Sequence, residues 1–292
     1  MKDSPLRDRT VVVTGAARGI GAALADALAR RGARLALLDH DEAALRATAA
    51  ALPGTVLALG TDVCDATALD EAAETVRARL GPPSVVVANA GVAEGGPFAR
   101  SDPGTWRRVI DVNLIGSAQT ARAFLPDLVR TAGYHLQIAS LASIGAAPMM
   151  SAYCASKSGV EAFAHTLRAE TAQHGVAVGI AYLGWTDTEL IRDADRYVTL
   201  RELRAHMPPP ARHVQPTATV AARLADAVER RRTAVYVPRW LRLTQLTRAA
   251  IPPVVLRATR RALPRVEADQ PLHPTGLLGP GGHPGGSPRA GA

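Results

Sequence analysis

The stretch TVVVTGAARGIGAAL, residues 10–24, decides the fold of this chain. A run of mostly β-branched residues leads into a turn that contains Gly15, Gly19 and Gly21, and an alanine-rich helical pattern begins near Ile20. Glycine allows positive φ angles and lets a backbone approach a pyrophosphate, whose charge is then held by N–H groups at the helix N-terminus. A strand, a glycine turn and a helix in this order are the context of a dinucleotide-binding turn rather than of an ordinary strand-to-helix connection.

Outward from this turn, short Val- and Leu-rich runs alternate with Ala- and Arg-rich helical stretches. We expect strands over residues 10–14, 33–39, 55–62, 84–89, 134–140, 176–182 and 233–237. The alternation is typical of βαβ units and predicts an α/β fold, a doubly wound (Rossmann-type) parallel seven-stranded sheet with helices on both faces. Two long helices, over 103–131 and 151–174, carry Ala and Gly on their packing faces, so we expect a homodimer or homotetramer built through them.

The composition argues against several other classes of protein. Of the 292 residues, 47% are hydrophobic, which is enough for a large core. Cys64 and Cys154 are the only cysteines, and neither stands in a metal-ligand spacing, so we expect neither a disulfide framework nor a metal site. The N-terminus is short and charged, and no run approaches the roughly 20 apolar residues that span a bilayer. We therefore expect a soluble, cytoplasmic protein.

The net charge of +8 is a property of the C-terminal part of the chain. Residues 192–265 hold 16 arginines and five acidic residues, whereas the rest is slightly acidic. The basic, amphipathic segment 239–263 suits either an interfacial helix that gives the protein peripheral membrane contact, or a lid or oligomer-contact helix with solvated arginines. It lacks the interleaved aromatic residues of a nucleic-acid binder, so we expect no nucleic-acid partner. The Gly- and Pro-rich tail 264–292 is predicted to be disordered.

Tyr153 and Lys157 lie four residues apart at the start of a predicted helix, so their side chains share one face. The chain has only one other lysine, Lys2, among many arginines, which argues against a chance surface pair. A lysine ammonium is a compact charge that can lower the pKa of a nearby phenol toward the range of a useful acid/base. We therefore predict that Tyr153 is a catalytic acid/base assisted by Lys157.

These motifs together resemble the short-chain dehydrogenase/reductase (SDR) family over about residues 10–238. Residues 1–238 are predicted to be the dinucleotide-binding catalytic domain, with a substrate loop at about 185–215. The glycine spacing G-x-x-x-G-x-G, the ANAG at 88–91 and the Tyr-x-x-x-Lys carry the likeness. It implies that Ser140, ahead of its rival Ser143, holds the substrate oxygen. It also implies that Asn113 distorts its helix and exposes a carbonyl that holds a water linking Lys157 to solvent.

The resemblance extends to the cofactor. Asp39 ends the second strand, where a carboxylate accepts hydrogen bonds from the adenosine ribose and repels a 2′-phosphate, which favours NAD over NADP. Arg18 could instead meet a 2′-phosphate or be a solvated turn residue. ANAG has Ala88 in place of the family's first Asn, and Leu183 replaces the Pro of its PGxxxT. The expected cofactor contacts are Gly15, Arg18, Gly19, Ile20, Gly21, Asp39, Asp62, Val63, Asn89, Ala90, Gly91, Tyr153, Lys157 and Thr188.

Membership of this family implies an NAD(P)-dependent oxidoreductase that moves hydride between nicotinamide and a carbonyl or secondary alcohol. Apolar residues in the loop of about 185–215 suggest a hydrophobic small-molecule substrate. The expected walls are Trp185, Leu190, Ile191, Tyr197, Met207 and Pro208–Pro210. The alternative is a redox-silent NAD(P)-binding regulatory or membrane-surface interaction protein, which would not need all four of Asn113, Ser140, Tyr153 and Lys157.

Overall fold

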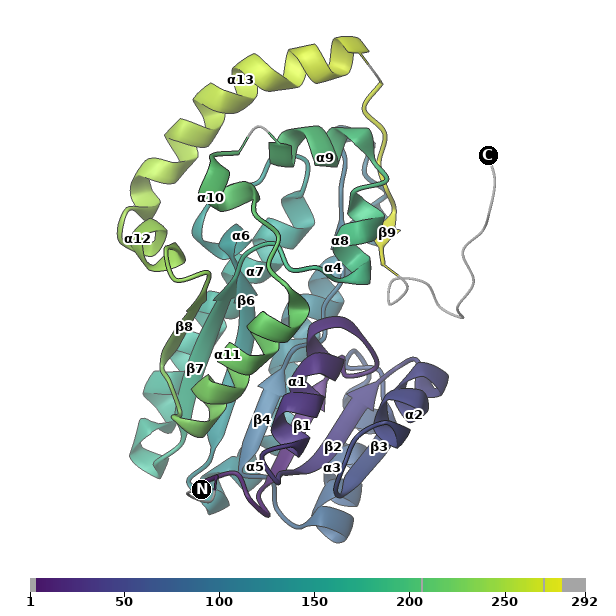
Figure 1. Cartoon of the computed structure of the whole chain (residues 1–292), viewed down its shortest axis with the longest axis vertical. Coiled ribbons are helices and arrows are strands. Elements are labelled where there is room, and N and C mark those ends of the chain that lie inside the picture. Colours follow the sequence, from purple (N-terminus) through teal and green to yellow (C-terminus); the bar gives the residue numbers. More distant parts are fainter. Residues whose placement is uncertain (1–3, 206, 270, 280–292) are drawn as a thin grey trace.

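Seven parallel strands form the centre of the molecule (Figure 1). The computed structural model describes residues 4–205, 207–269 and 271–279. The strands are β1 Thr10–Thr14, β2 Arg34–Asp39, β3 Val56–Gly60, β4 Val85–Ala88, β6 Tyr134–Ser140, β7 Ala177–Leu183 and β8 Ala234–Val237. Their order in the sheet is β3-β2-β1-β4-β6-β7-β8, which confirms the predicted Rossmann-type sheet. The order reverses between β1 and β4, where such sheets open a crevice at their carboxyl ends.

Helices cover both faces of the sheet, which is why its strands are almost wholly apolar. On one face lie α1 Gly19–Ala29, α2 Glu42–Ala50 and α11 Thr217–Glu229, and on the other lie α3 Ala66–Leu80, α5 Gly116–Thr131 and α7 Ser151–Thr171. Leu24 of α1 and Leu224 of α11 belong to the apolar core between the first group of helices and the sheet. Phe124 of α5 belongs to the core on the opposite face. These close-packed small aliphatic side chains fix the strand ends that carry the site.

The helix predicted over 103–131 is interrupted. It consists of α4 Pro103–Ile110, a π-helical turn Asp111–Ile115 and α5. Within the turn the Gly116 N–H reaches back five residues to the Asp111 carbonyl. A π-turn inside an α-helix often marks a functional position, and this one contains Asn113.

The remaining elements surround the carboxyl ends of the strands. They are α6 Leu141–Ile144, α8 Glu189–Ala194, α9 Val198–Ala205, α10 Pro209–Arg212, α12 Leu241–Leu246 and α13 Ile251–Asp269, with 3-10 turns at Phe98–Arg100, Ala172–His174 and Arg248–Ala250. A second, two-stranded antiparallel sheet joins β5 Ala93–Glu94 to β9 Leu277–Leu278. None of the helices in the described ranges is long and apolar enough to cross a membrane.

The predicted disordered tail is wrong for residues 264–279, except for residue 270, which is outside the described ranges. The helix α13 continues through Pro264 to Asp269, and residues 271–279 run along the body as a strap (Figure 1). Thr275 exchanges hydrogen bonds with Gly95, and Leu272 and Leu278 are buried. Composition misled the prediction because two buried leucines and a few backbone bonds are enough to fix so short a segment. Residues 280–292 lie outside the described part of the chain.

Candidate active site

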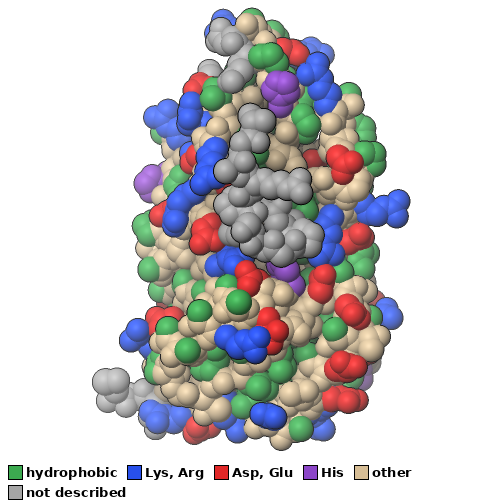
Figure 2. Space-filling model, turned by 90° about the vertical axis from the view of Figure 1, so that its right-hand side faces the viewer, with side chains coloured by type: hydrophobic (Ala, Val, Ile, Leu, Met, Phe, Trp, Pro, Cys, Tyr) green, Lys and Arg blue, Asp and Glu red, His purple; other side chains and the backbone are tan. Residues whose placement is uncertain are grey.

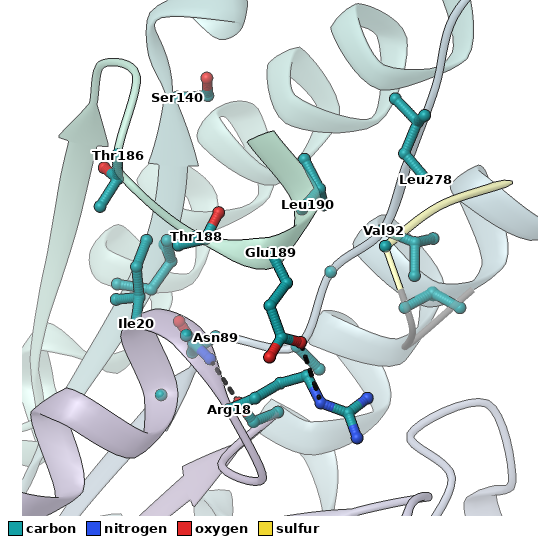
Figure 3. Close-up of a pocket in the computed structure, with 18 of the residues that line it drawn as sticks. Arg18, Ile20, Asn89, Val92, Ser140, Thr186, Thr188, Glu189, Leu190 and Leu278 are labelled. Carbon is teal, nitrogen blue, oxygen red and sulfur yellow. Dashed lines mark hydrogen bonds and ion pairs between the residues drawn. The ribbon is translucent and has the colours of Figure 1, made fainter. Parts of the chain in front are cut away.

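The predicted site residues meet at one cavity at the carboxyl ends of the strands (Figure 3). Every expected cofactor contact and three of the four expected catalytic residues line it. These are Gly15, Arg18, Gly19, Ile20, Gly21, Asp39, Asp62, Val63, Asn89, Ala90, Gly91, Ser140, Tyr153, Lys157 and Thr188. Asn113 is fully buried beneath its wall.

The glycine turn has the shape of a phosphate cradle. Gly15 and Gly19 have φ angles of 65° and 56°, and a Cβ on Gly21 would lie 2.1 Å from the Gly15 carbonyl oxygen. The Asn89 side chain donates to the carbonyls of Thr14 and Gly15 at 2.9 and 3.0 Å, which ties the turn to the end of β4. The turn is thus held although Ala88 replaces the family's first Asn. Its open backbone fits a pyrophosphate.

Asp39 closes β2 beside the glycine turn, as predicted. Its carboxylate accepts hydrogen bonds at 3.0 Å from the backbone N–H groups of Ala17 and Asp41. Burial favours its neutral form, but His40 and these N–H groups outweigh burial and lower the pKa of Asp39. The site therefore presents a negative charge where a ribose would lie.

Arg18 is already engaged by carboxylates. Its guanidinium pairs with Asp41, and its Nε lies 3.5 Å from a carboxylate oxygen of Glu189 in α8 (Figure 3). The sequence left open whether this arginine is solvated or meets a 2′-phosphate. In the structure it is partly buried and links the glycine turn to the loop that follows β7.

Asp62 and Val63 line the far end of the cavity, beyond β3. One oxygen of Asp62 accepts from the Cys64 N–H and the other from Arg108, both at 2.9 Å. Although burial opposes it, these bonds lower the pKa of Asp62. Arg108 also lines the cavity and was not predicted. Its partner Asp62 is 46 residues away in sequence, so no local pattern marks this arginine as a site residue.

Lys157 is buried next to Tyr153. Its Nζ donates to the Ile138 carbonyl at 3.2 Å and lies 5.7 Å from the centre of the Tyr153 ring. Burial lowers the pKa of Lys157 to about 8, because a low-dielectric surrounding penalises the ammonium. The lysine thus titrates close to neutral pH.

The expectation that Lys157 lowers the pKa of Tyr153 is not met in the protein alone. Burial raises the pKa of the phenol, and the neighbouring Ser140 hydroxyl only partly offsets this. The reason is that burying a phenolate away from water costs more free energy than a hydrogen bond from one hydroxyl restores. Tyr153 therefore rests as a neutral phenol, the form that donates a proton.

The two candidate serines differ in their surroundings. Ser140 lines the cavity at the end of β6, and its Oγ accepts from the Ala142 N–H at 3.2 Å. Ser143 is buried and donates its hydroxyl proton to the Ser140 carbonyl. Of the two, Ser140 alone offers a hydroxyl to a substrate in this cavity.

Asn113 organises the wall behind the pair. Its side chain accepts from the Val92 N–H at 2.8 Å, and donates at 2.9 Å to the Val92 carbonyl and to Ser156 in α7. Its own carbonyl accepts from the Ser117 hydroxyl at 2.7 Å. The expected helix distortion is present as the π-turn, but Asn113 is fully buried, so the expected exposed carbonyl is not found.

The turn after β7 places Thr188 over the glycine turn. A Cβ on Gly19 would lie 3.5 Å from the Thr188 methyl group. Leu183 stands where the family has a proline, and it extends β7 by pairing with Val237, while the Gly184 N–H bonds to the Val237 carbonyl at 2.8 Å. The added strand pairing holds this turn without the proline.

The apolar end of the cavity differs in part from the prediction. Leu190 and Ile191 line it, and Trp185 and Tyr197 pack behind them. Met207 and Pro208–Pro210 do not line it, because the chain carries them to α10, beside α9. Their place is taken by residues that the sequence did not suggest, Val92 and the strap residues Leu278 and Gly279.

Comparison with known proteins agrees with this geometry. A family model described as short chain dehydrogenase matches residues 9–197. The chain belongs to the short-chain dehydrogenase/reductase family. Members of the SDR family are oxidoreductases that transfer hydride with NAD(P).

Individual relatives support the same family. This SDR is 38% identical over 189 residues to "Probable oxidoreductase EphD" of Mycobacterium tuberculosis, an alignment that spans 63% of this chain and 32% of that protein. It is 36% identical over 216 residues to "Galactitol 2-dehydrogenase (L-tagatose-forming)" of Cereibacter sphaeroides, spanning 73% and 85% of the two chains. The chain thus spans about a third of the first relative's length. A short-chain type dehydrogenase/reductase from Mycobacterium marinum shares the fold, with a TM-score of 0.72 and 23% identity over 79% of this chain and 94% of that one.

Proposed function

We propose that this SDR uses NAD and interconverts a ketone and a secondary alcohol on a hydrophobic small molecule. The observation that carries the choice of NAD is the acidic ribose end of the cavity. Asp39 presents a carboxylate there. Arg18, which could otherwise bind a 2′-phosphate, forms ion pairs with Asp41 and Glu189 instead. A phosphate at this place would meet net negative charge.

The fit of the cofactor follows from the cavity. The glycine turn with Ile20 would hold the pyrophosphate, Asp39 the ribose, and Asp62 with Val63 the adenine. Asn89, Ala90, Gly91 and Thr188 surround the place that remains for the nicotinamide half. The bound cofactor supplies the hydride for reduction or accepts it in oxidation.

The residues of the chain handle the proton. Ser140 holds the substrate oxygen through its hydroxyl and stabilises the charge that develops on it. Tyr153, resting as a neutral phenol, donates the proton to that oxygen in reduction and takes it back in oxidation. Lys157 favours the phenolate that remains, and Asn113 fixes the wall against which Lys157 is packed.

The substrate end of the cavity is apolar, which supports a hydrophobic substrate. Leu190 and Ile191 from α8 line this end together with Val92 and the strap residue Leu278, and Figure 3 labels Leu190, Val92 and Leu278. Apolar walls with a few convergent polar groups are typical of small-molecule sites.

The proposed oxidoreductase activity is tested by incubating the protein with NADH or NADPH and a panel of bulky ketones. We expect absorbance loss at the nicotinamide band with NADH. In Tyr153→Phe, turnover should fall about 100-fold or more, because a general acid contributes this much, while NADH affinity stays nearly intact. Wild-type protein that binds NADH and turns over no ketone or alcohol would favour the redox-silent regulatory alternative.

Cofactor choice is tested with Asp39→Ala. We expect the ratio of kcat/KM for NADH over NADPH to fall about tenfold or more, because an ion repelling a 2′-phosphate is removed. Asp65→Ala is the matched control, since Asp65 is also a carboxylate that accepts a backbone N–H, at the start of α3, but lies outside the cavity. An unchanged ratio in Asp39→Ala would contradict the assigned role of Asp39.

A further inference from the structure

The helices α12 and α13 carry an unusual share of exposed apolar side chains. Leu243 and Leu246 are 66% and 77% exposed, and Val254 and Leu256 are 60% and 51% exposed. Single exposed leucines are common on protein surfaces, but here four large apolar side chains that are more than half exposed stand within fourteen residues of two consecutive helices. We name these four side chains the apolar patch.

The first part of this surface, α12 and the 3-10 turn after it, is anchored to the body. Leu241, the first residue of α12, is buried, and Arg248 in the turn forms an ion pair at 3.0 Å with the buried Glu161 of α7. Gln245 and Tyr182 donate hydrogen bonds to the same carboxylate at 2.8 Å. Because α12 and the turn after it are fixed in this way, the exposure of Leu243 and Leu246 is a feature of the packed fold.

Arginines follow the patch along α13. Arg257, Arg260, Arg261 and Arg265 are exposed, and none has a hydrogen-bond or ion-pair partner in the part of the chain that the structure describes. In Figure 1, α13 forms the upper edge of the molecule, and Figure 2 shows blue Lys and Arg side chains at that end. The surface of α12 and α13 thus combines protruding apolar groups with unpaired positive charge.

We propose that this surface docks on an anionic lipid membrane. Apolar side chains flanked by arginines bind such membranes because the apolar side chains enter the boundary between headgroups and acyl chains, while the arginines attract the acidic headgroups. No described helix spans a bilayer, so the contact is peripheral. Docking would hold the cavity of the proposed enzyme close to a pool of hydrophobic substrates, although the docking itself does not depend on the activity.

Two other occupants fit the surface less well. In a symmetric dimer the apolar patch would be covered, but that contact supplies no negative charge to the arginines of α13. A nucleic acid would satisfy the arginines, but it offers nothing to the exposed Leu246 and Val254, and no aromatic side chain stands among the arginines of α13 for base stacking. Anionic lipid complements both the charge and the apolar groups.

The experiment is sedimentation of the full-length protein with vesicles of phosphatidylcholine alone or mixed with phosphatidylglycerol. We expect binding only to the mixed vesicles, and weaker binding as salt is raised. Arg257→Gln/Arg260→Gln/Arg261→Gln should weaken it about 100-fold, from the usual contribution of a basic residue near an acidic leaflet. Leu243→Ser/Leu246→Ser/Val254→Ser/Leu256→Ser should abolish it.

The matched control is Arg79→Gln/Arg122→Gln/Arg223→Gln, which removes the same charge from exposed positions on α3, α5 and α11. It should bind vesicles like the wild type, and NADH titration confirms that each variant is folded and keeps its cofactor site. The proposal is overturned if wild type does not bind mixed vesicles or if the control weakens binding as much as the α13 triple variant. It is also overturned if the patch variant changes the oligomeric state or DNA retention while vesicle binding stays intact.

Discussion

At the scale of single residues, the cavity combines a buried ammonium with a buried phenol. Burial lowers the pKa of Lys157 to about 8 and raises the pKa of Tyr153. Below pH 8 both Lys157 and Tyr153 are protonated. As the pH rises above 8, Lys157 loses its proton before Tyr153 does. In reduction Tyr153 gives up its proton and remains as a phenolate, which the charged lysine beside it stabilises.

From these values we predict that kcat/KM for ketone reduction falls as the pH rises through about 8. This parameter reports the free enzyme, in which Lys157 has the lowered pKa. Lys157→Met should lose most activity at every pH, and Lys157→Arg should keep the charge, so its remaining activity should lack the decline near pH 8. A wild-type profile that is flat between pH 7 and 10 would contradict this assignment.

His135 is a second residue whose burial has a measurable effect. It lies on β6 with no exposed surface, and neither ring nitrogen has a hydrogen-bond partner among the described residues. Burial lowers its pKa from 6.5 to about 4. Above pH 6.5 the ring is neutral in both states, whereas between 6.5 and 4 only the unfolded chain takes up the proton, so the free energy of unfolding decreases as the pH falls.

We predict that this histidine costs the protein about 3 kcal/mol of stability between pH 6.5 and 4. Urea unfolding of His135→Leu should show a correspondingly smaller loss over that range. The exposed His165, changed to Gln, is the control and should leave the pH dependence as in the wild type. Equal acid sensitivity in wild type and His135→Leu would show that other groups dominate.

At the scale of elements, the site depends on how closely α1 approaches the end of β1. A methyl group on Gly21 would lie 2.1 Å from the Gly15 carbonyl oxygen, a backbone atom that has no side-chain freedom to move away. We predict that Gly21→Ala moves α1 off the turn and weakens NADH binding about tenfold or more, at a stability cost of about 1–3 kcal/mol. Isothermal titration and thermal unfolding measure the two effects.

Gly54→Ala separates these effects. Gly54 has a φ angle of 82° in the turn before β3, at the opposite end of the sheet from the cavity, and nothing lies within 4 Å of its added Cβ. It should lower stability by about 1–2 kcal/mol through the left-handed backbone alone, with unchanged NADH affinity. If Gly21→Ala binds NADH as Gly54→Ala does, close approach of α1 is not what shapes the cradle.

The elements also show what a sequence can predict. Regular alternation placed all seven strands of the main sheet within two residues of their observed bounds, and short-range spacing brought Tyr153, Lys157 and Ser140 to one cavity. Two features were missed: the partnership of Arg108 with Asp62, and the strap. Each depends on contacts between residues far apart in the chain, which leave no local pattern.

At the scale of the whole molecule, the strap closes a site that the first two thirds of the chain builds. Residues 271–279 return from α13 to pair with β5, and the Gly279 N–H bonds to Asp193 in α8 at 2.8 Å. Tyr197 in turn donates to the Thr275 carbonyl at 3.0 Å. The family match ends at residue 197, so this wall is made by a part of the chain outside it. The predicted homodimer or homotetramer through the two long helices stays a prediction.

Leu278 and Leu277 allow the role of the strap to be tested, because adjacent residues of a strand face opposite ways. Leu278 is buried and lines the cavity, whereas Leu277 packs against Val63 and Val92 and does not line it. We predict that Leu278→Ala changes the ratio of kcat/KM between a bulky and a small ketone about tenfold or more in favour of the bulky one, because the pocket gains the volume of the lost side chain.

Leu277→Ala removes the same atoms from the same strand and should leave that ratio unchanged. NADH affinity should stay close to wild type in both variants, since neither leucine is among the expected cofactor contacts. Steady-state kinetics over a graded series of ketones distinguishes the outcomes. Equal selectivity in Leu278→Ala and Leu277→Ala would mean that the strap only stabilises the fold, and that α8 alone sets the shape of the substrate pocket.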